Sequence, residues 1–399
     1  MKIKIINNNL QTDEILKMAG SYAAICYSSK KYDDFKDEDE KNIRIAKHCI
    51  KSGHHSIFDH IMITLNIEGI PKILAMMLNN IEFYNTSEKS GRYTKFKGYL
   101  YEKWIDKFKH IILNSDRVEN HVKEDLKLVE KLAMENARYF LDIFHETNMI
   151  YTISVRQVSY LYYSMIKLSN FIKDKYSNNF IEGGYTNDNY EYLKMLICDF
   201  TKELENSIPF INDLCIEPKD GNDYLFNKIN FFNKDIVKEY DGTEIINDDD
   251  LSYTIKYEAS LACIAQLQRH RTTTLFIDLE DVFYNEYEVY IPEILYYSLN
   301  CEEYEKEYIE DMKSINYIPI AALGKVIEIG TPNAYKIKSL ERLCSRVQLE
   351  VCRNVQSASR DINNFAFCKP DEYNVYAKCK NFKCQEPCKY GINGLKRYI

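Results

Sequence analysis

Two segments of the chain share one pattern of apolar and polar positions. Between residues 60 and 67, isoleucine or leucine occupies every second position, which predicts a strand with one buried face. A break then follows, and Pro71 suits the first turn of a helix that we expect at residues 73–78. Residues 251–257 alternate in the same way, and the apolar helical stretch after them ends at Arg269-His270-Arg271. The repeated order of strand, helix and polar loop predicts an internal repeat.

Mainly helical sequence follows in each repeat. We expect long helices at residues 125–141 and 151–173 in the first repeat and at residues 337–357 in the second. The predicted fold class is therefore α+β, with an antiparallel sheet and flanking long helices in each repeat. The predicted regions are an N-terminal repeat at 1–207, a C-terminal repeat at 208–366 and a short Cys-rich tail at 367–399.

Composition narrows the class of protein. The 399 residues are 45% hydrophobic and 28% charged, which is typical of a globular protein large enough for two or three cores. The net charge of −8 argues against a broad surface for polymeric nucleic acid, which needs a basic face. We find no run of about 18 apolar residues for a membrane span, and no signal peptide at the start. A cytoplasmic location is the resulting expectation.

The tripeptide Arg269-His270-Arg271 has two interpretations. Cations at a helix C-terminus favour the negative end of the helix dipole and need no ligand. Alternatively, the arginine forks bind a phosphate or a pair of carbonyl oxygens. Gln266 lies three residues earlier on the same helical face and could hydrogen-bond the edge of a base.

Residues 88–93 read Glu-Lys-Ser-Gly-Arg-Tyr and also have two interpretations. They suit a polar turn with a solvated arginine, or a phosphate cradle made of a hydroxyl, backbone N–H groups and an arginine. Residues 54–60 gather three histidines and Asp59, which raises the alternative of a metal site. Their spacing differs from His-Glu-x-x-His and they precede a strand, so we favour no metal there.

Together these residues resemble the flavin-dependent thymidylate synthase (ThyX-like) family. Its signature is Arg-His-Arg, then seven residues, then Ser, usually followed by Gly-Arg-Tyr, with His-x-Ser/Thr-x-x-Glu-His upstream. The first repeat matches the upstream and downstream parts but has Asn80-Ile81-Glu82 where Arg-His-Arg belongs. The second repeat has Arg269-His270-Arg271, with Leu279 in place of the serine and Asp281 in place of the later arginine.

Two further arginines of the family divide in the same way. The first repeat carries Arg138 in a segment resembling Ala-Arg-x-x-Leu-Pro, whereas the second reads Ser314-Ile315-Asn316-Tyr317-Ile318-Pro319 there. The second repeat carries Arg342 six residues before Gln348, in a segment resembling Ala-Gln-x-Glu-Ile, whereas the first has Met165. The complementary losses predict a diverged tandem duplication whose active sites combine residues from both repeats.

The resemblance implies reductive methylation of dUMP to dTMP, with FAD as cofactor and with NADPH and methylenetetrahydrofolate as co-substrates. It implies a catalytic role for Arg269 and Ser90, with the charge of Arg269 stabilising the electron-rich uracil ring. The implied substrate-binding residues are Gln266, Arg269, Glu88, Ser90, Gly91, Arg92, Arg138 and Arg342. The implied FAD-binding residues are His54, Ser56, Asp59, Arg269, His270 and Arg271.

The family forms homotetramers, so two repeats per chain imply a homodimer that acts as a pseudo-tetramer. Two family asparagines associated with flavin fall at Ser154 and Tyr160 in the first repeat, and at Thr331 and Ile337 in the second. This departure leaves two alternatives open. One is a flavin-dependent pyrimidine-nucleotide hydroxymethylase or another base-modifying relative, and the other is a catalytically silent nucleotide-binding scaffold.

The tail contains four cysteines within its last 32 residues, at Cys368, Cys379, Cys384 and Cys388. Four thiolates suit a zinc or iron–sulfur site. Their spacing matches no established motif, so reduced thiols without a metal are the alternative.

Overall fold

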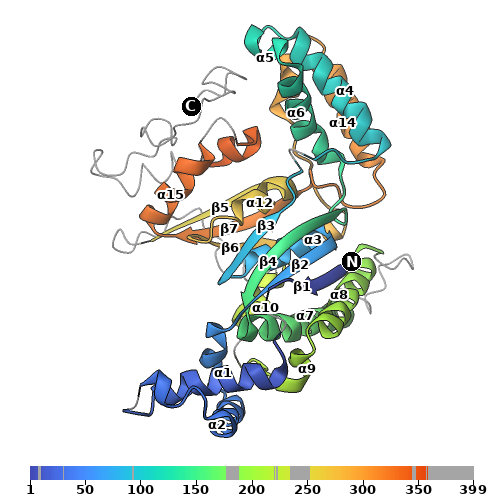
Figure 1. Cartoon of the computed structure of the whole chain (residues 1–399). Coiled ribbons are helices and arrows are strands. Elements are labelled where there is room, and N and C mark those ends of the chain that lie inside the picture. Colours follow the sequence, from blue (N-terminus) through green and yellow to red (C-terminus); the bar gives the residue numbers. More distant parts are fainter. Residues whose placement is uncertain are drawn as a thin grey trace. The chain divides into compact units, whose positions relative to one another are not determined.

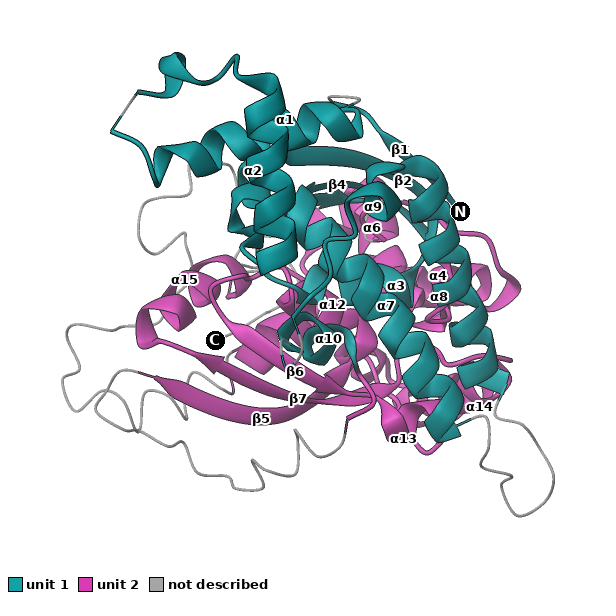
Figure 2. Ribbon diagram, turned by 90° about the horizontal axis from the view of Figure 1, so that it is seen from below, with its two compact units in different colours: residues 1–89, 146–230 teal, residues 90–145, 231–399 magenta. Residues whose placement is uncertain are grey.

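The computed structural model describes residues 1–7, 10–29, 31–91, 94–176, 188–219, 221, 223–233, 252–343, 347–355 and 357. The chain divides into two compact units, which are coloured separately in Figure 2. Unit 1 comprises residues 1–89 and 146–230, and unit 2 comprises residues 90–145 and 231–399. Each unit is thus built from two separate stretches of chain, whereas the sequence predicts contiguous regions that meet near residue 207.

Unit 1 contains a four-stranded antiparallel sheet in the order β1-β2-β4-β3 (Figure 1). Its strands are β1 (Lys2–Ile5), β2 (Met62–Pro71), β3 (Tyr84–Glu88) and β4 (Glu146–Ser154). Its helices are α1 (Thr12–Ile25), η1 (Tyr32–Asp34), α2 (Asp39–Ser52), η2 (His55–His60), α3 (Lys72–Asn80), α7 (Val155–Tyr176), α8 (Asp188–Ser207), α9 (Phe210–Leu214) and α10 (Tyr224–Ile229).

Unit 2 contains a three-stranded antiparallel sheet in the order β5-β7-β6. Its strands are β5 (Tyr253–Ser260), β6 (Thr274–Asp278) and β7 (Leu323–Gly330). Its helices are α4 (Tyr99–Asn114), α5 (Asn120–Glu124), α6 (Leu126–Ala137), η3 (Arg138–Phe140), α12 (Leu261–Leu267), α13 (Glu280–Phe283), η4 (Glu293–Tyr297), α14 (Cys301–Lys313) and α15 (Pro332–Arg342).

The two sheets have corresponding strand orders and registers. In each, the strand–helix–strand run β2-α3-β3 or β5-α12-β6 places its two strands on either side of a later central strand, β4 or β7. The pair Ile70↔Thr147 corresponds to Ala259↔Gly324, and Asn85↔Thr152 corresponds to Thr274↔Ile329. The α+β class with antiparallel sheets and long helices is therefore confirmed.

Local chemistry explains the ends of these elements. In β2, alternate residues Ile63, Leu65 and Ile67 are buried, as the sequence pattern predicts. The strand does not break after Ile67 but continues to Pro71 through a register shift. Gly69 supports this irregularity with φ of 67°, a backbone region that glycine enters without a Cβ clash.

Three predicted helices differ from the structure. Residues 151–154, expected to be helical, complete the central strand β4, and α7 starts only at Val155. The helix expected at 337–357 starts earlier, where the Thr331 side chain caps α15 ahead of Pro332. This helix ends at Arg342, and helical structure is present again at residues 349–355. The helix expected at 125–141 ends at Ala137 and gives way to the 3-10 turn η3.

Candidate active site in unit 2

The C-terminus of α12 carries the predicted anion-binding residues. The helix starts at Ser260, whose Oγ accepts a hydrogen bond from the backbone N–H of Cys263 at 3.0 Å. After its last turn, the backbone N–H of His270 donates to the carbonyl of Leu267 at 3.0 Å. Arg269 and His270 are half-buried and Arg271 is exposed. The buried helix therefore ends with two arginines near the surface of unit 2.

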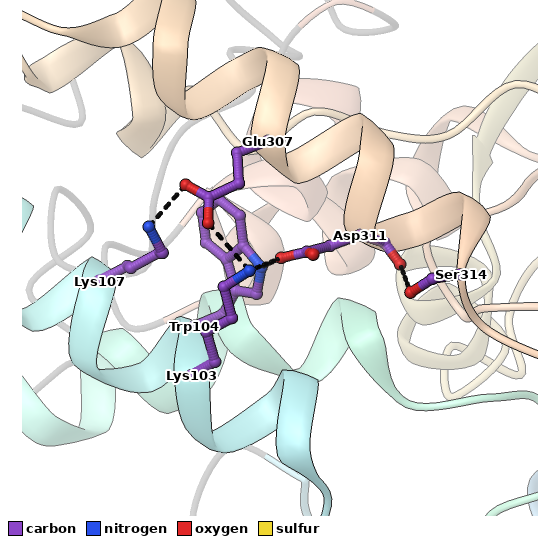
Figure 3. Close-up of polar contacts among 6 residues, drawn as sticks. All are labelled: Lys103, Trp104, Lys107, Glu307, Asp311 and Ser314. Carbon is purple, nitrogen blue, oxygen red and sulfur yellow. Dashed lines mark hydrogen bonds and ion pairs between the residues drawn. The ribbon is translucent and has the colours of Figure 1, made fainter.

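Arg138 reaches unit 2 because the segment 90–145 packs there. The single tryptophan of the chain, Trp104 of α4, is fully buried and donates from Nε1 to Asp311 of α14 at 2.7 Å. Lys103 and Lys107 point toward the same helix, and Figure 3 shows their ion pairs with Asp311 and Glu307, both at 2.6 Å. These contacts explain why this segment joins unit 2 rather than unit 1.

Arg138 contacts residues from the second half of the sequence. Its side chain is 7% exposed, and Nη2 donates to the carbonyl of Ala262 at 3.2 Å and to Oε1 of Gln348. The side-chain amide of Gln266 donates to the same oxygen of Gln348. Gln348 thus joins an arginine carried by the first predicted repeat to the glutamine predicted to contact a base.

Arg342 lies against the other side of the Gln266 backbone. Its Nη2 donates to the Gln266 carbonyl at 2.9 Å, and its Nε donates to Nε2 of His270 at 2.5 Å. Burial, followed by the positive charges of Arg342 and Lys338, lowers the pKa of His270 to about 3. His270 is therefore neutral near pH 7 and accepts a hydrogen bond from Arg342.

Two buried carboxylates stabilise this region. Glu350 accepts hydrogen bonds from the backbone N–H of Ser260 at 2.8 Å, and from the Ser260 and Tyr139 hydroxyls, both at 2.6 Å. Burial raises the pKa of Glu350, and these hydrogen bonds oppose the rise. The Glu350 carboxylate therefore fixes the start of α12 and the segment that carries Arg138.

The second carboxylate, Glu328 of β7, forms an ion pair with Lys338 of α15, and both side chains are almost completely buried. The hydroxyls of Tyr253 and Tyr257 donate to its two oxygens at 2.7 and 3.0 Å. Burial lowers the pKa of Lys338, against the attraction of Glu328. The sequence pattern did not lead us to predict this ion pair. Glu328 was the available indication, because it is a charged residue among the apolar residues of β7.

Comparisons with known proteins match the first part of the chain. Residues 9–166 match the family model described as thymidylate synthase complementing protein. Over 178 residues the chain is 27% identical to a flavin-dependent thymidylate synthase of Clostridium tetani (strain Massachusetts / E88), covering 39% of this chain and 70% of that protein. Over this first part, the chain is similar to the ThyX-like family. The Arg269-His270-Arg271 and Arg342 segments lie beyond the residues that the family model matches.

Solved structures similar to this ThyX-like protein include two of ThyX from Helicobacter pylori with FAD and dUMP. They share 18% and 17% of residues with it, cover 54% of this chain, and are themselves covered to 98% and 97%. The TM-score is 0.29 for each.

The other predicted site residues of the ThyX-like protein have contacts of their own. In unit 1, His54 and Ser56 are exposed, and Asp59 binds Arg156 at 2.5 Å and the Ser154 hydroxyl at 2.8 Å. Glu88 binds Lys72 at 2.6 Å. In unit 2, the Ser90 carbonyl accepts from the backbone N–H of Thr94 at 3.1 Å, with Gly91 next to it. Arg92 lies outside the described residues.

In unit 1, the positions that correspond to Arg269, Arg271 and Arg342 are occupied by other types of residue. Asn80, at the place of Arg269, donates to the backbone carbonyl of Lys228 in α10 at 2.7 Å. Lys228 is 2% exposed and lies 3.7 Å from Glu82, which stands at the place of Arg271. Met165, at the place of Arg342, is fully buried. The backbone carbonyl and the side chain of Lys228 in α10 therefore interact with the polar residues at the C-terminal end of α3.

The described residues also bear on the metal and membrane predictions. Across the described part of the chain, no group of three or more His, Cys, Asp or Glu residues is arranged to hold a metal ion. Cys368, Cys379, Cys384 and Cys388 lie outside that part, so a zinc or iron–sulfur site in the tail stays a prediction. Among the helices described, none is long and apolar enough to cross a membrane.

Proposed function

We propose that this ThyX-like protein is a flavin-dependent thymidylate synthase-like enzyme that methylates dUMP reductively to dTMP, using methylenetetrahydrofolate and NADPH. One observation carries the proposal: Arg138 from the first half of the chain meets Gln266, Gln348 and Arg342 from the second half in one cluster of unit 2. The matching sheet registers support a tandem duplication with divided residues. On this basis the working form is a cytoplasmic homodimer that acts as a pseudo-tetramer.

The residues of unit 2 suit a uracil nucleotide. Arg269, Arg138 and Arg342 supply cationic forks for the phosphate and for negative charge that develops on the ring during activation. Neutral His270 holds the Arg342 guanidinium without competing for an anion. The Oε1 atom of Gln266 is buried and has no hydrogen-bond partner among the described residues, which suits an incoming N–H donor.

The donor set also suits FAD, whose diphosphate is an anion. Arg269 and Arg271 follow a helix end near the surface of unit 2, where an arginine fork fits a phosphate. His54, Ser56 and Asp59 stay FAD contacts that the resemblance predicts, and Asp59 is held by Arg156 and Ser154. When bound, the reduced flavin supplies the reducing equivalents of the reaction.

The test is an anaerobic incubation of purified protein with FAD, NADPH, methylenetetrahydrofolate and dUMP, with products identified by mass spectrometry. We expect a mass gain that corresponds to dTMP. Unchanged dUMP, with active folate and reduced flavin verified in the same tube, would reject the synthase and leave a silent binding protein.

A second candidate is a pyrimidine-nucleotide hydroxymethylase. It is favoured by Ser154 and Tyr160 at the positions of two flavin-associated asparagines of the family. In unit 1 these residues contact Asp59 at 2.8 Å and His55 at 2.9 Å. A hydroxymethylated product in the same incubation would select this reaction.

A further inference from the structure

A chain of hydrogen bonds runs through the core of unit 2 from Glu350 to Gln266. Tyr139 donates its hydroxyl proton to Oε2 of Glu350 at 2.6 Å and accepts from Nε2 of Gln348. Oε1 of Gln348 accepts from Nε2 of Gln266. Tyr139, Gln348 and Glu350 are all buried, so their polar groups depend on one another for partners.

The donor and acceptor roles in this series of hydrogen bonds are fixed at both ends. Glu350 acts as the acceptor, because the backbone N–H of Ser260 donates to one of its oxygens and two hydroxyls donate to the other. Arg138 has donors only and points Nη2 at Gln348, so Gln348 must turn its carbonyl oxygen toward Arg138. Its NH2 group then faces Tyr139, whose own proton goes to Glu350.

The same logic orients Gln266. Its amide meets two acceptors, Oε1 of Gln348 and, at 3.5 Å, the backbone carbonyl of Ala262. Only the NH2 group of Gln266 satisfies both, so the opposite orientation would set oxygen against oxygen. Oε1 of Gln266 is left buried without a hydrogen-bond partner in the described part of unit 2. A buried acceptor of this kind is costly unless a ligand donates to it.

We propose that Glu350, Tyr139 and Gln348 form a positioning relay that holds the Gln266 amide oxygen toward the bound base and makes the site selective for uracil over cytosine nucleotides. Uracil carries a hydrogen on N3, which donates to that oxygen. Cytosine has a lone pair on N3, so two acceptors would face each other. Loss of a matched hydrogen bond in a buried site discriminates strongly between ligands. The inference rests on the proposed function, because it takes the ligand to be a pyrimidine nucleotide.

The first test uses ligands and the unaltered protein. Calorimetric titration with dUMP, dCMP and N3-methyl-dUMP should give a Kd for dUMP that is lower than the other two by about tenfold or more. Equal affinity for dUMP and dCMP would overturn the relay. Binding of neither nucleotide would overturn both the relay and the proposed function. Selective binding of dUMP without formation of dTMP would retain the relay and reject the synthase.

The second test changes the relay. Gln348→Met has a similar volume but frees the Gln266 amide to turn, so the ratio of the dCMP to the dUMP Kd should fall to about threefold or less. Gln348→Glu keeps an acceptor for Arg138 and Gln266 but loses the donor to Tyr139, so the ratio should fall less than in Gln348→Met. Tyr335→Phe, which removes a buried hydroxyl that donates to the backbone carbonyl of Val355, is the matched control. A ratio unchanged in Gln348→Met, with folding verified by circular dichroism, would overturn the relay.

Discussion

Arg342 donates a hydrogen bond from Nε to Nε2 of His270, joining the end of α15 to the residues that follow α12. The interaction requires a neutral imidazole, because a protonated Nε2 has no lone pair to accept. The histidine of the Arg-His-Arg tripeptide therefore positions an arginine and carries no charge near neutral pH. This relationship has a consequence for stability at low pH.

We predict that unit 2 loses stability as pH falls from about 6.5 toward 3. The folded pKa of His270 is about 3, below its ordinary value, so the unfolded chain binds a proton in this range before the folded protein does. At pH 4 the loss from this residue is about 3 kcal/mol. Denaturant unfolding at several pH values measures it. In His270→Gln, which retains an acceptor for Arg342, the pH dependence should be weaker; equal slopes for both proteins would contradict the prediction.

Arg269→Ala should abolish thymidylate formation while the protein stays folded. Removal of a group that stabilises developing charge lowers kcat by about a hundredfold or more. Arg269 follows the last helical turn and is only half-buried, so little packing is lost. Turnover and thermal unfolding are measured together, with the exposed Arg117→Ala in unit 2 as the matched control. Normal turnover in Arg269→Ala would count against the assignment.

Met165→Arg should not create a second nucleotide site. Met165 is fully buried in unit 1, so an arginine there introduces an unpaired charge and should lower the free energy of unfolding by about 3 kcal/mol or more. Lys228 and Glu82 would still occupy the neighbouring end of α3. Met165→Leu, which conserves volume, should cost less than about 1.5 kcal/mol.

Calorimetry provides the matching measurement of sites. We expect one dUMP per chain in the unaltered protein, because the arginines of unit 2 have no counterpart at Asn80 and Met165. A stoichiometry of two equivalent sites per chain would reject the division of residues between the repeats.

Trp104→Ala should both destabilise unit 2 and weaken nucleotide binding. Trp104 is fully buried, stacks on Phe140 with ring centroids 5.2 Å apart and anchors α4 to α14. Truncation of such a side chain costs about 3–5 kcal/mol. Because Phe140 ends the turn that starts at Arg138, the change should also displace that arginine and raise the Kd for dUMP. Tyr99→Ala, at the exposed start of α4, should leave both quantities nearly unchanged.

Local sequence pattern predicted part of this fold and part of the site. The alternation that ends before Pro71 and the apolar stretch before Arg269 predicted β2, β5 and α12 well, because one face of each element is buried. The central strand β4 was taken for helix in part, since Tyr151 and Ile153 lie in an apolar run that fits either period. Periodicity alone does not distinguish a short buried strand from a helix.

The site residues, too, were predicted only in part. Arg138, Gln266 and Arg342 were predicted from motifs, and the structure brings them together in unit 2. Tyr139 and Lys338 were missed because their function depends on buried partners far away in sequence. The assignment of residues 90–145 to unit 2 likewise depends on Trp104 and Asp311, and no local signal announces that pairing.

The two-segment construction of each unit also constrains synthesis. The chain passes from unit 1 to unit 2 at residue 90, returns at 146 and leaves again at 231. Residues 90–145 therefore leave the ribosome well before their partners in α14 and at residues 318–320 exist. At typical rates of translation the delay is on the order of 10–30 s. During that time Trp104 and Phe108 are exposed to water, so the nascent chain is a natural client for chaperones, and a gene truncated after the first repeat would encode a protein with an uncovered apolar hairpin.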